Sequence, residues 1–205
     1  MIVWEQDLHL LPDDADLRSA ALLSSGAIAM TAFEAAAPKP GERIVVLGAG
    51  VCALLLVQLL AAASPAELVV VDASPERGAL AVALGATKHC SSLDAARLED
   101  TFTVVVETTG STEAAQASCL LAASEARVVF TRLFPPGTLL DRVQLSLRRL
   151  TIRGASVASP VGWSGAVRTL GTGILDPRPL ITRETALTDG ALLEANSLVT
   201  VVLSP

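Results

Sequence analysis

The stretch Ile44-Val45-Val46-Leu47-Gly48-Ala49-Gly50-Val51-Cys52-Ala53 decides the fold of this 205-residue chain. An apolar segment, typical of a buried strand, leads into a glycine turn and then into an apolar helix. A second apolar segment, residues 68–71, is followed by Asp72. The order of strand, turn, helix, strand and carboxylate is typical of a site that binds a dinucleotide.

Each residue of the glycine turn has a predicted role. Gly48 permits the tight turn, Gly50 lets the backbone approach a diphosphate, and Ala53 lets the helix lie close to the strand. The helix begins at Val51 and Cys52, whose N–H groups are free to bind phosphate oxygens. The partial positive charge of a helix N-terminus favours the same ligand.

Asp72 is the strongest single candidate for a contact with the adenosine ribose. A carboxylate at this position favours NAD over NADP, because a 2′-phosphate would face it without an arginine beside it. The alternative is an ordinary strand–turn–helix in an alanine-rich protein, with Asp72 as a surface acid that caps the next helix. The context favours the dinucleotide, since the glycines lie between a Val/Ile strand and an apolar helix.

Composition excludes several classes of protein. The length fits a single domain, and the net charge of −6 without a basic patch argues against nucleic-acid binding. The three cysteines and two histidines show no metal-ligand spacing, so no zinc site is predicted. The first 12 residues are not typical of a signal peptide, and the longest apolar run is too short to span a bilayer. We therefore expect a cytoplasmic protein without a membrane partner.

Strands and helices alternate along the chain. Strands are expected at 43–47, 67–71, 87–90, 102–107, 126–131, 150–155 and 198–203. Helices are expected at 17–37, 51–63, 75–84, 93–98, 113–121, 165–172 and 190–196, with 139–147 helical or irregular and 174–188 irregular. The central strands are apolar at consecutive positions, which predicts an α/β fold with a Rossmann-like, doubly wound parallel sheet. We expect one domain over residues 1–205, with a core at 39–155, an N-terminal arm and helix at 1–38 and a C-terminal segment at 156–205.

Several motifs in the same order resemble the cofactor domain of medium-chain dehydrogenases, the zinc alcohol dehydrogenase superfamily. They are Lys39-Pro40-Gly41-Glu42-Arg43 with the stretch to Gly50, Val71-Asp72-Ala73-Ser74-Pro75-Glu76-Arg77, Leu84-Gly85-Ala86-Thr87, Glu107-Thr108-Thr109-Gly110-Ser111, and the segments 150–154 and 176–181. The resemblance implies binding of NAD(H). In that family a separate catalytic domain supplies the zinc ligands. No G-H-E motif or cysteine cluster occurs here, so the expectation is a truncated, zinc-independent relative.

Arg132 departs from the pattern of the family. The segment Phe130-Thr131-Arg132-Leu133-Phe134 carries a bulky cation where the family usually has a glycine near the nicotinamide. If Arg132 points into the cleft, it contacts a phosphate or carboxylate, or it blocks the nicotinamide. The alternative is a solvent-facing arginine beyond the strand.

Five further residues are candidates for the site. Arg77 is expected either to stack on the adenine or to be a solvated helix residue. Thr108 and Gly110 are expected to line the pocket of the nicotinamide ribose. Glu107, an acid that ends a buried strand, is either a general base with a raised pKa or an acceptor of backbone hydrogen bonds. Thr31 matches a family threonine near the nicotinamide, or is a helix-core threonine bonded to a carbonyl.

Three hypotheses about function follow. The first is an NAD-dependent oxidoreductase that acts on, or assists with, a small-molecule metabolite, with a separate chain or second copy supplying the missing wall of the cleft. The second is a non-redox accessory enzyme, such as a cyclase or isomerase, or a non-catalytic partner on the same scaffold. The third concerns assembly: the strand-like arms at 1–11 and 198–203 are expected to pair with each other or with another subunit, giving a homodimer.

Overall fold

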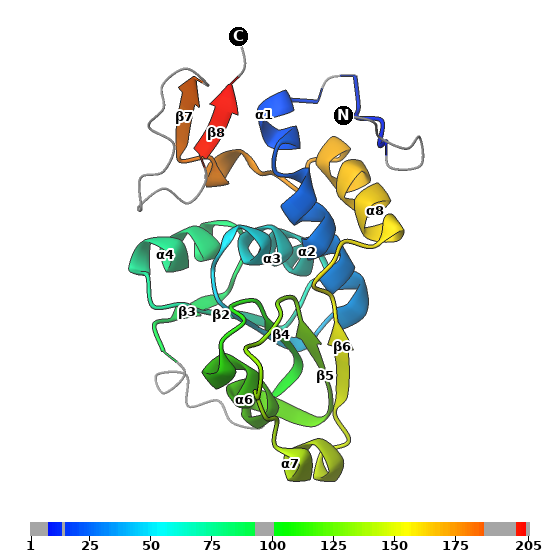
Figure 1. The fold of residues 1–205 in the computed structure, drawn as a ribbon, viewed down its shortest axis with the longest axis vertical. Coiled ribbons are helices and arrows are strands. Elements are labelled where there is room, and N and C mark those ends of the chain that lie inside the picture. Colours follow the sequence, from blue (N-terminus) through cyan, green and yellow to red (C-terminus); the bar gives the residue numbers. More distant parts are fainter. Residues whose placement is uncertain (1–7, 14, 93–100, 187–199, 204–205) are drawn as a thin grey trace.

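A computed structural model describes residues 8–13, 15–92, 101–186 and 200–203. In this part of the chain six strands form one sheet in the order β3-β2-β1-β4-β5-β6 (Figure 1). The strands are β1 (Arg43–Leu47), β2 (Glu67–Val71), β3 (Lys88–Cys90), β4 (Phe102–Glu107), β5 (Ala122–Phe130) and β6 (Thr151–Gly154). Every neighbouring pair is parallel, which confirms the predicted Rossmann-like fold.

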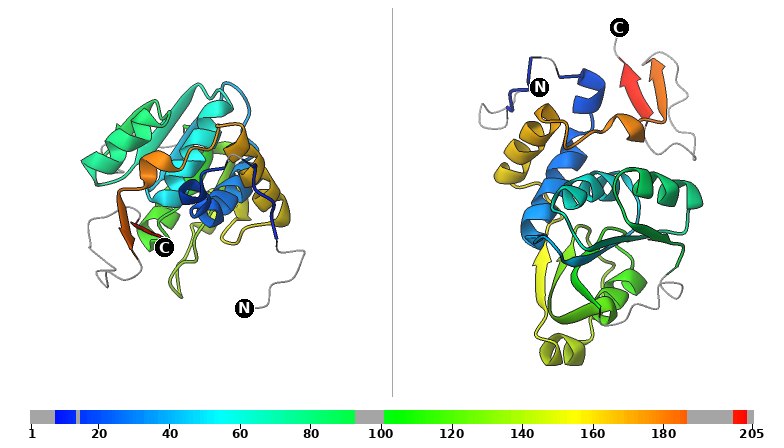
Figure 2. Two further views of the ribbon diagram at one scale, coloured as in Figure 1. Left: turned by 90° about the horizontal axis from the view of Figure 1, so that it is seen from above. Right: turned by 180° about the vertical axis from the view of Figure 1, so that it is seen from behind.

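Helices cover both faces of the sheet, as the apolar strands require (Figures 1 and 2). Alternate residues of β1 show the two layers: Ile44 and Val46 belong to the core under α2 and α3, whereas Val45 and Leu47 belong to the core under α6. The helices are α1 (Leu17–Ala20), α2 (Leu23–Ala36), α3 (Val51–Ala62), α4 (Pro75–Ala83), α6 (Thr112–Leu121), α7 (Arg142–Leu147) and α8 (Pro160–Gly171). None of these helices is long and apolar enough to cross a membrane.

The chain reverses its direction of winding between β1 and β4. From β1 it moves outward through β2 to β3, then crosses to β4 on the other side of β1 and continues to β5 and β6. β1 and β4 are paired in register, so Leu47 and Glu107 end the two strands side by side. Ligands of open α/β sheets bind at the carboxyl ends of the strands at such a reversal point.

Two predicted helices differ in the structure. The helix expected at 17–37 is two helices, α1 and α2, because Leu22 bonds back to Ser19 in a tight turn and begins a new helix at Leu23. α8 begins at Pro160, five residues before its expected start at 165, since the Ser159 hydroxyl caps it by accepting from the N–H of Gly162 at 2.9 Å. The helices expected at 93–98 and 190–196 lie outside the described residues.

A second, two-stranded sheet replaces part of the segment that was expected to be irregular. The short 3₁₀ helix η2 (Arg178–Leu180) leads to β7 (Arg183–Ala186), which pairs in parallel with β8 (Thr200–Leu203) (Figure 2). β8 is therefore the predicted final strand, slightly shorter than expected. Its described partner is β7, and residues 1–7 of the N-terminal arm lie outside the described residues.

A half-buried ion pair joins the turn before β1 to β5. Arg127 donates to Glu42 at 2.7 Å, and the two side chains are 20 % and 15 % exposed. Burial alone would raise the pKa of Glu42, but the Arg127 guanidinium and the amide of Lys39 outweigh it and hold that pKa below its ordinary value. The contribution of the pair to stability is therefore present above the ordinary pKa of a glutamate and is lost as the pH falls through the lowered value.

Glu42→Gln is expected to lower the free energy of unfolding at neutral pH by about 3 kcal/mol, because Arg127 would remain half-buried without its counter-charge. Urea unfolding measures this change. Glu125→Gln is the matched control, since the Glu125–Arg149 pair is 69 % exposed on both sides and contributes little. Equal effects of the two substitutions would contradict the assignment.

Candidate functional site

The start of α3 is open and has no side-chain cap. Gly50 is the N-cap residue in an extended conformation, and no side chain bonds the first N–H groups of the helix. A Cβ built on Gly50 would meet nothing within 4 Å. The amides of Val51 and Cys52 therefore begin the helix beside open space, which is the arrangement of an anion site.

Gly48 makes the turn that presents this helix. Its φ of +99° lies in a region that L side chains rarely adopt, and its N–H donates to the carbonyl of Val71 at 2.7 Å. A Cβ at this position would lie 2.6 Å from the Thr108 hydroxyl. The Thr108 hydroxyl itself donates to the Leu47 carbonyl at 2.7 Å, so the turn after β1 and the turn after β4 are packed directly together.

Two cavities lie at the carboxyl edge of the sheet. The larger has a volume of about 680 Å³ and is lined by the start of α3, by α2 and by the residues that follow β4, β5 and β6: Ser25, Ile28, Gly50, Val51, Cys52, Ala53, Thr108, Thr131, Arg132, Leu133 and Ser156. The smaller, of about 350 Å³, lies over β1 and β2 and is lined by Leu47, Gly48, Val71, Asp72, Ala73, Arg77, Ser92, Thr109, Ser111, Glu113 and Ala114. The glycine turn thus contributes residues to both.

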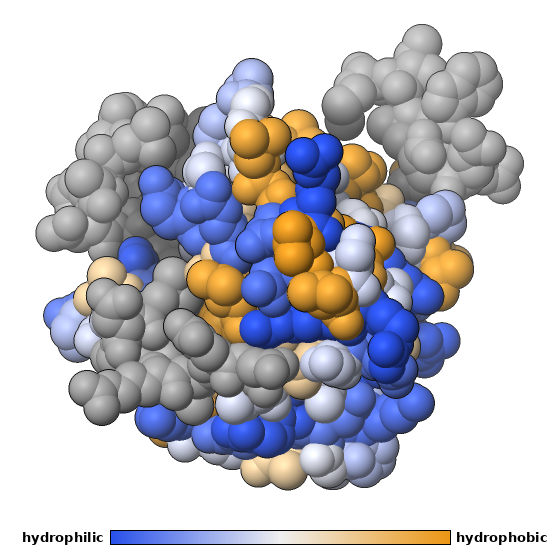
Figure 3. Space-filling view, turned by 90° about the horizontal axis from the view of Figure 1, so that it is seen from below, coloured by the Kyte–Doolittle hydropathy of each residue, from blue (hydrophilic) through white to orange (hydrophobic). Residues whose placement is uncertain are grey.

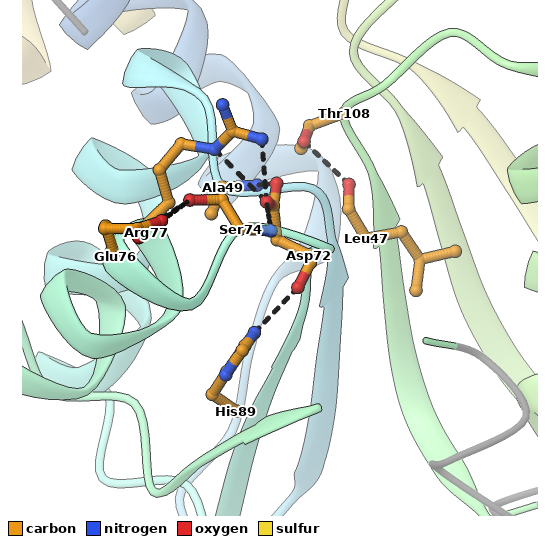
Figure 4. A network of polar contacts seen from close by, with 8 residues as sticks. All are labelled: Leu47, Ala49, Asp72, Ser74, Glu76, Arg77, His89 and Thr108. Atoms are coloured by element: carbon orange, nitrogen blue, oxygen red, sulfur yellow. Dashed lines mark hydrogen bonds and ion pairs between the residues drawn. The ribbon is translucent and has the colours of Figure 1, made fainter. Parts of the chain in front are cut away.

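Asp72 links the glycine turn to α4 in the smaller cavity (Figure 4). One carboxylate oxygen accepts from the amide of Ala49 at 2.8 Å, and the other accepts from the amide of Ser74 at 2.9 Å. Arg77 donates to the latter oxygen through Nη2 at 2.8 Å and through Nε at 3.1 Å. The first oxygen receives a single described donor and therefore retains acceptor capacity.

One expectation about this pair is wrong in the structure. Asp72 was expected to have no arginine beside it, but Arg77 forms an ion pair with it. Arg77 is an exposed residue of α4, in agreement with the solvated alternative, and its guanidinium lies against the carboxylate because the first turn of α4 brings it within reach. Burial alone would raise the pKa of Asp72, but Arg77 and the two amides outweigh it and hold the pKa below its ordinary value.

His89 supports Asp72 from the neighbouring strand. Its Nε2 lies 2.7 Å from the Asp72 carbonyl oxygen, a contact in which the ring nitrogen donates (Figure 4). A Cβ on Gly78 of α4 would lie 2.3 Å from the same imidazole, so the ring fills the space between β3 and α4. The histidine is thus part of the scaffold that fixes the carboxylate.

Glu107 is fully buried at the end of β4 and points into the turn that follows it. Its carboxylate accepts from the amide of Thr109 at 2.6 Å, from the Thr109 hydroxyl and from the amide of Gly110 at 3.0 Å. It lines neither of the two cavities. Of the two interpretations of this acid, the contacts favour the acceptor of backbone hydrogen bonds over the general base.

Glu107→Gln is expected to lower the free energy of unfolding by about 3 kcal/mol, because an amide group in this place would turn a donor toward donors and lose the charge-assisted bonds. Thermal and urea unfolding measure the change. Glu113→Gln makes the same chemical change at an exposed neighbour and is expected to have little effect on stability. An unchanged stability of Glu107→Gln with complete loss of turnover would instead support the general base.

Thr31 does not reach the cavities. Its hydroxyl donates to the Ala27 carbonyl at 2.8 Å and accepts from the amide of Ser159 at 2.9 Å. It therefore joins α2 to the start of α8. The residues of α2 that line the larger cavity are Ser25 and Ile28, which sequence reasoning missed and which no motif distinguishes from other residues of an apolar helix.

Gly110 and Arg132 meet beside the larger cavity. Gly110 has a φ of +77°, and a Cβ there would lie 3.0 Å from the Cβ of Arg132. The glycine thus leaves room for the stem of the arginine. Arg132 lines the larger cavity, and its charge acts on the thiol of Cys52 in the first turn of α3. Arg132 is exposed to solvent and also lines the cavity, so it has features of both predicted orientations.

The model of a protein family described as zinc-binding dehydrogenase matches residues 50–172. The chain belongs to this zinc-binding dehydrogenase family. The match runs from the helix that follows the glycine turn to the end of α8 and confirms the resemblance to the medium-chain dehydrogenase superfamily.

Relatives in the zinc-binding dehydrogenase family agree with this assignment. The 2-dehydro-3-deoxy-L-galactonate 5-dehydrogenase of Pseudoalteromonas atlantica is 28% identical over 194 residues, which are 91% of this chain and 57% of that protein. The (R,R)-butanediol dehydrogenase of Bacillus subtilis is 32% identical over 108 residues, 53% of this chain and 30% of that protein. The matches cover 57% and 30% of these two relatives, so the chain spans less than two thirds of their length.

A solved structure shows the same fold. A candidate zinc-binding dehydrogenase of Sinorhizobium meliloti 1021, bound to NADP, superposes with a TM-score of 0.85 at 21% identity, covering 94% of this chain and 61% of that one. At this identity the comparison establishes the fold of the zinc-binding dehydrogenase domain.

The family is described as zinc-binding, but the described part of this chain contains no set of zinc ligands. No three His, Cys, Asp or Glu side chains gather there in a way that would hold a metal ion. Cys52 is the one cysteine that lines the larger cavity. Burial raises the pKa of its thiol to about 12, and no other described cysteine or histidine lines that cavity.

Proposed function

We propose that this chain binds NAD(H) and serves as the cofactor-binding part of an oxidoreductase that interconverts a small alcohol and the corresponding carbonyl compound. The observation that carries the proposal is the uncapped start of α3 between two cavities. One cavity contains the fixed carboxylate of Asp72, and the other has space for a second nucleoside and a substrate. The open volume over Gly50 fits a diphosphate, since a side chain there would fill it.

The residues that would hold the cofactor follow from this geometry. The amides of Val51 and Cys52 would bind the diphosphate, and the free acceptor capacity of Asp72 would receive the adenosine ribose. Thr108 would lie beside the second nucleoside, because it lines the larger cavity. The nicotinamide supplies the hydride chemistry; the protein binds and orients it. No proton-transfer role is assigned to Glu107, whose oxygens are engaged in the turn.

We propose that NAD is preferred over NADP, for a reason that differs from the one first expected. Arg77 is occupied by Asp72, and Glu113 lines the same cavity. A 2′-phosphate would therefore meet one paired cation and an additional carboxylate, and the net charge of the lining would oppose it.

The substrate class rests on the relatives. One relative is named for a sugar acid and another for a diol, and both names describe dehydrogenases. A hydroxyl or carbonyl compound is the chemistry that the two names share. Since the described residues offer no zinc ligand set, no step of the proposed function is assigned to zinc.

Calorimetric titration of the full chain with NADH tests the proposal. Saturable binding below millimolar concentration, competed by ADP-ribose, is the expected result. No heat of binding at millimolar NADH would refute the role, and the non-redox alternative on the same scaffold would then stand.

We also propose that the protein forms a homodimer or binds a partner chain. β6 ends the sheet, and no described strand pairs with its outer edge. Near it, Val143 and Leu147 of α7 are 62 % and 71 % exposed, and the face seen from the side of α7 shows apolar side chains among hydrophilic ones (Figure 3). Unpaired edges with apolar neighbours favour association. Light scattering that gives the mass of a single 21.1 kDa chain would contradict the dimer.

A further inference from the structure

Arg132 is an exposed cation that lines the larger cavity and has no partner among the described residues. It makes no hydrogen bond or ion pair with the described residues, unlike Arg77, which bonds Asp72 in the neighbouring cavity. No Asp or Glu is among the residues that line the larger cavity. A positively charged wall of this kind attracts an anionic ligand.

Two hydroxyl groups in the same cavity are also unused. Ser25 of α2 and Ser156, which follows β6, line it and make no side-chain hydrogen bond with the described residues. By contrast, the hydroxyls of Thr108 and Thr131 already donate to the carbonyls of Leu47 and Glu107. The cavity therefore offers one guanidinium and two hydroxyls as free donors, which suits an oxyanion with several oxygen atoms.

Arg132 lines the same cavity as the start of α3 but comes from a different part of the sheet. The residue follows β5, which is two strands from β1 in the sheet. Strand spacing places the end of β5 about 10 Å from the glycine turn. The diphosphate would be held by the amides at the start of α3. A nicotinamide nucleoside on this side of the turn brings no further negative charge, so the unpaired guanidinium is assigned to an anionic group of a second molecule.

We infer that Arg132, aided by the free hydroxyls of Ser25 and Ser156, binds the carboxylate or phosphate group of an anionic substrate. The inference rests on the proposed function, because the cofactor defines which part of the cavity the substrate occupies. It narrows the substrate class from alcohols and carbonyl compounds in general to hydroxy acids, oxo acids or phosphorylated alcohols. Arg132 is a specificity-determining residue in this reading, since a neutral alcohol would leave its charge without a partner.

Titrations of the 205-residue chain, saturated with NADH, test the inference. The probes are malonate for the carboxylate, glycerol 3-phosphate for the phosphate and glycerol as the neutral compound. We expect at least one of the two anions to bind and glycerol not to bind. Arg132→Gln is expected to lower the affinity for the anion by about tenfold or more, because the substitution removes a charge-assisted hydrogen bond. Which anion binds more tightly distinguishes carboxylate from phosphate.

Arg142→Gln on α7 is the matched control, because it removes the same charge from an exposed residue outside the cavity. It is expected to leave both the anion and NADH titrations unchanged. NADH affinity is also expected to stay within about twofold in Arg132→Gln, because the guanidinium is not assigned to the diphosphate. A tenfold loss of NADH affinity without any effect of the anions would assign Arg132 to the cofactor and overturn the inference.

The two proposals fail in different ways. If the wild-type protein does not bind NADH, the proposed function fails. If NADH binds normally but neither anion binds, or if both bind equally to the wild-type and Arg132→Gln proteins, the inference about Arg132 fails alone.

Discussion

Gly50→Asp is expected to abolish NADH binding while leaving the protein at least as stable as the wild type. Gly50 has the extended conformation of an N-cap residue, with φ −74° and ψ 176°, and nothing lies within 4 Å of a Cβ built on it. An aspartate can adopt this conformation and cap the free amides of α3, which stabilises a helix by roughly 0.3 kcal/mol relative to a glycine cap. The same carboxylate would occupy the place of the diphosphate and repel it.

The loss of affinity is expected to be about a hundredfold or more, since repulsion between the carboxylate and two phosphate charges at close range costs roughly 3 kcal/mol. Calorimetry measures the affinity and thermal unfolding measures the stability. Gly50→Ala is the control, because it adds a Cβ without a charge or a capping group. It should lower the affinity for NADH less than Gly50→Asp does. Normal NADH binding by Gly50→Asp would show that the diphosphate does not lie at the start of α3.

Asp72→Ala is expected to reverse the preference between the two cofactors. The substitution removes the acceptor for the ribose, a charge-assisted bond worth about 2 kcal/mol, so NADH should bind about thirtyfold more weakly. It also frees Arg77, whose guanidinium now bonds Asp72 through two nitrogens. A free arginine at this position is suited to a 2′-phosphate, so NADPH should bind more tightly than to the wild type.

Two further variants separate the causes. The double variant Asp72→Ala with Arg77→Ala should not show the increased affinity for NADPH, because it lacks the arginine that would bind the 2′-phosphate. Asp72→Asn keeps one acceptor oxygen, so its affinity for NADH should lie between those of the wild type and Asp72→Ala. Thermal unfolding must accompany these titrations, since Asp72 also bonds the amides of Ala49 and Ser74. Parallel losses of NADH and NADPH affinity would contradict the ribose contact.

Local sequence was sufficient for the part of the fold that forms the site. β1, β2 and β4 begin and end at the predicted residues, and α3 ends one residue early, because consecutive apolar residues and glycine punctuation mark these boundaries. The open amides of α3 also follow from the sequence, since a glycine at the N-cap position offers no side chain to cover them.

The start of α8 could have been predicted. Ser159 and Pro160 repeat the Ser-Pro signal of Ser74 and Pro75, which correctly marked the start of α4. By contrast, β7 could not be found locally, because its partner β8 is distant in the sequence and pairing across such a separation leaves no nearby pattern.

The orientations of side chains in the site could not be predicted from the sequence. The pairing of Arg77 with Asp72 depends on the geometry of the turn before α4, and the burial of Glu107 depends on donors that its own turn brings toward it. The sequence identified Arg132 as a departure from the glycine that the family usually has at this place. Only the structure shows that the space beside Gly110 directs its stem along the cavity wall.

The turn after β4 is a shared wall between the two cavities. Thr108 faces the larger cavity and Thr109 the smaller, and the buried carboxylate of Glu107 anchors the residues between them. A partition fixed in this way lets each half of a dinucleotide occupy its compartment without rearranging the other. Fragments such as AMP and nicotinamide mononucleotide should then occupy the protein together without cooperativity, and the tightness of the intact molecule arises because the covalent link raises the local concentration of each half.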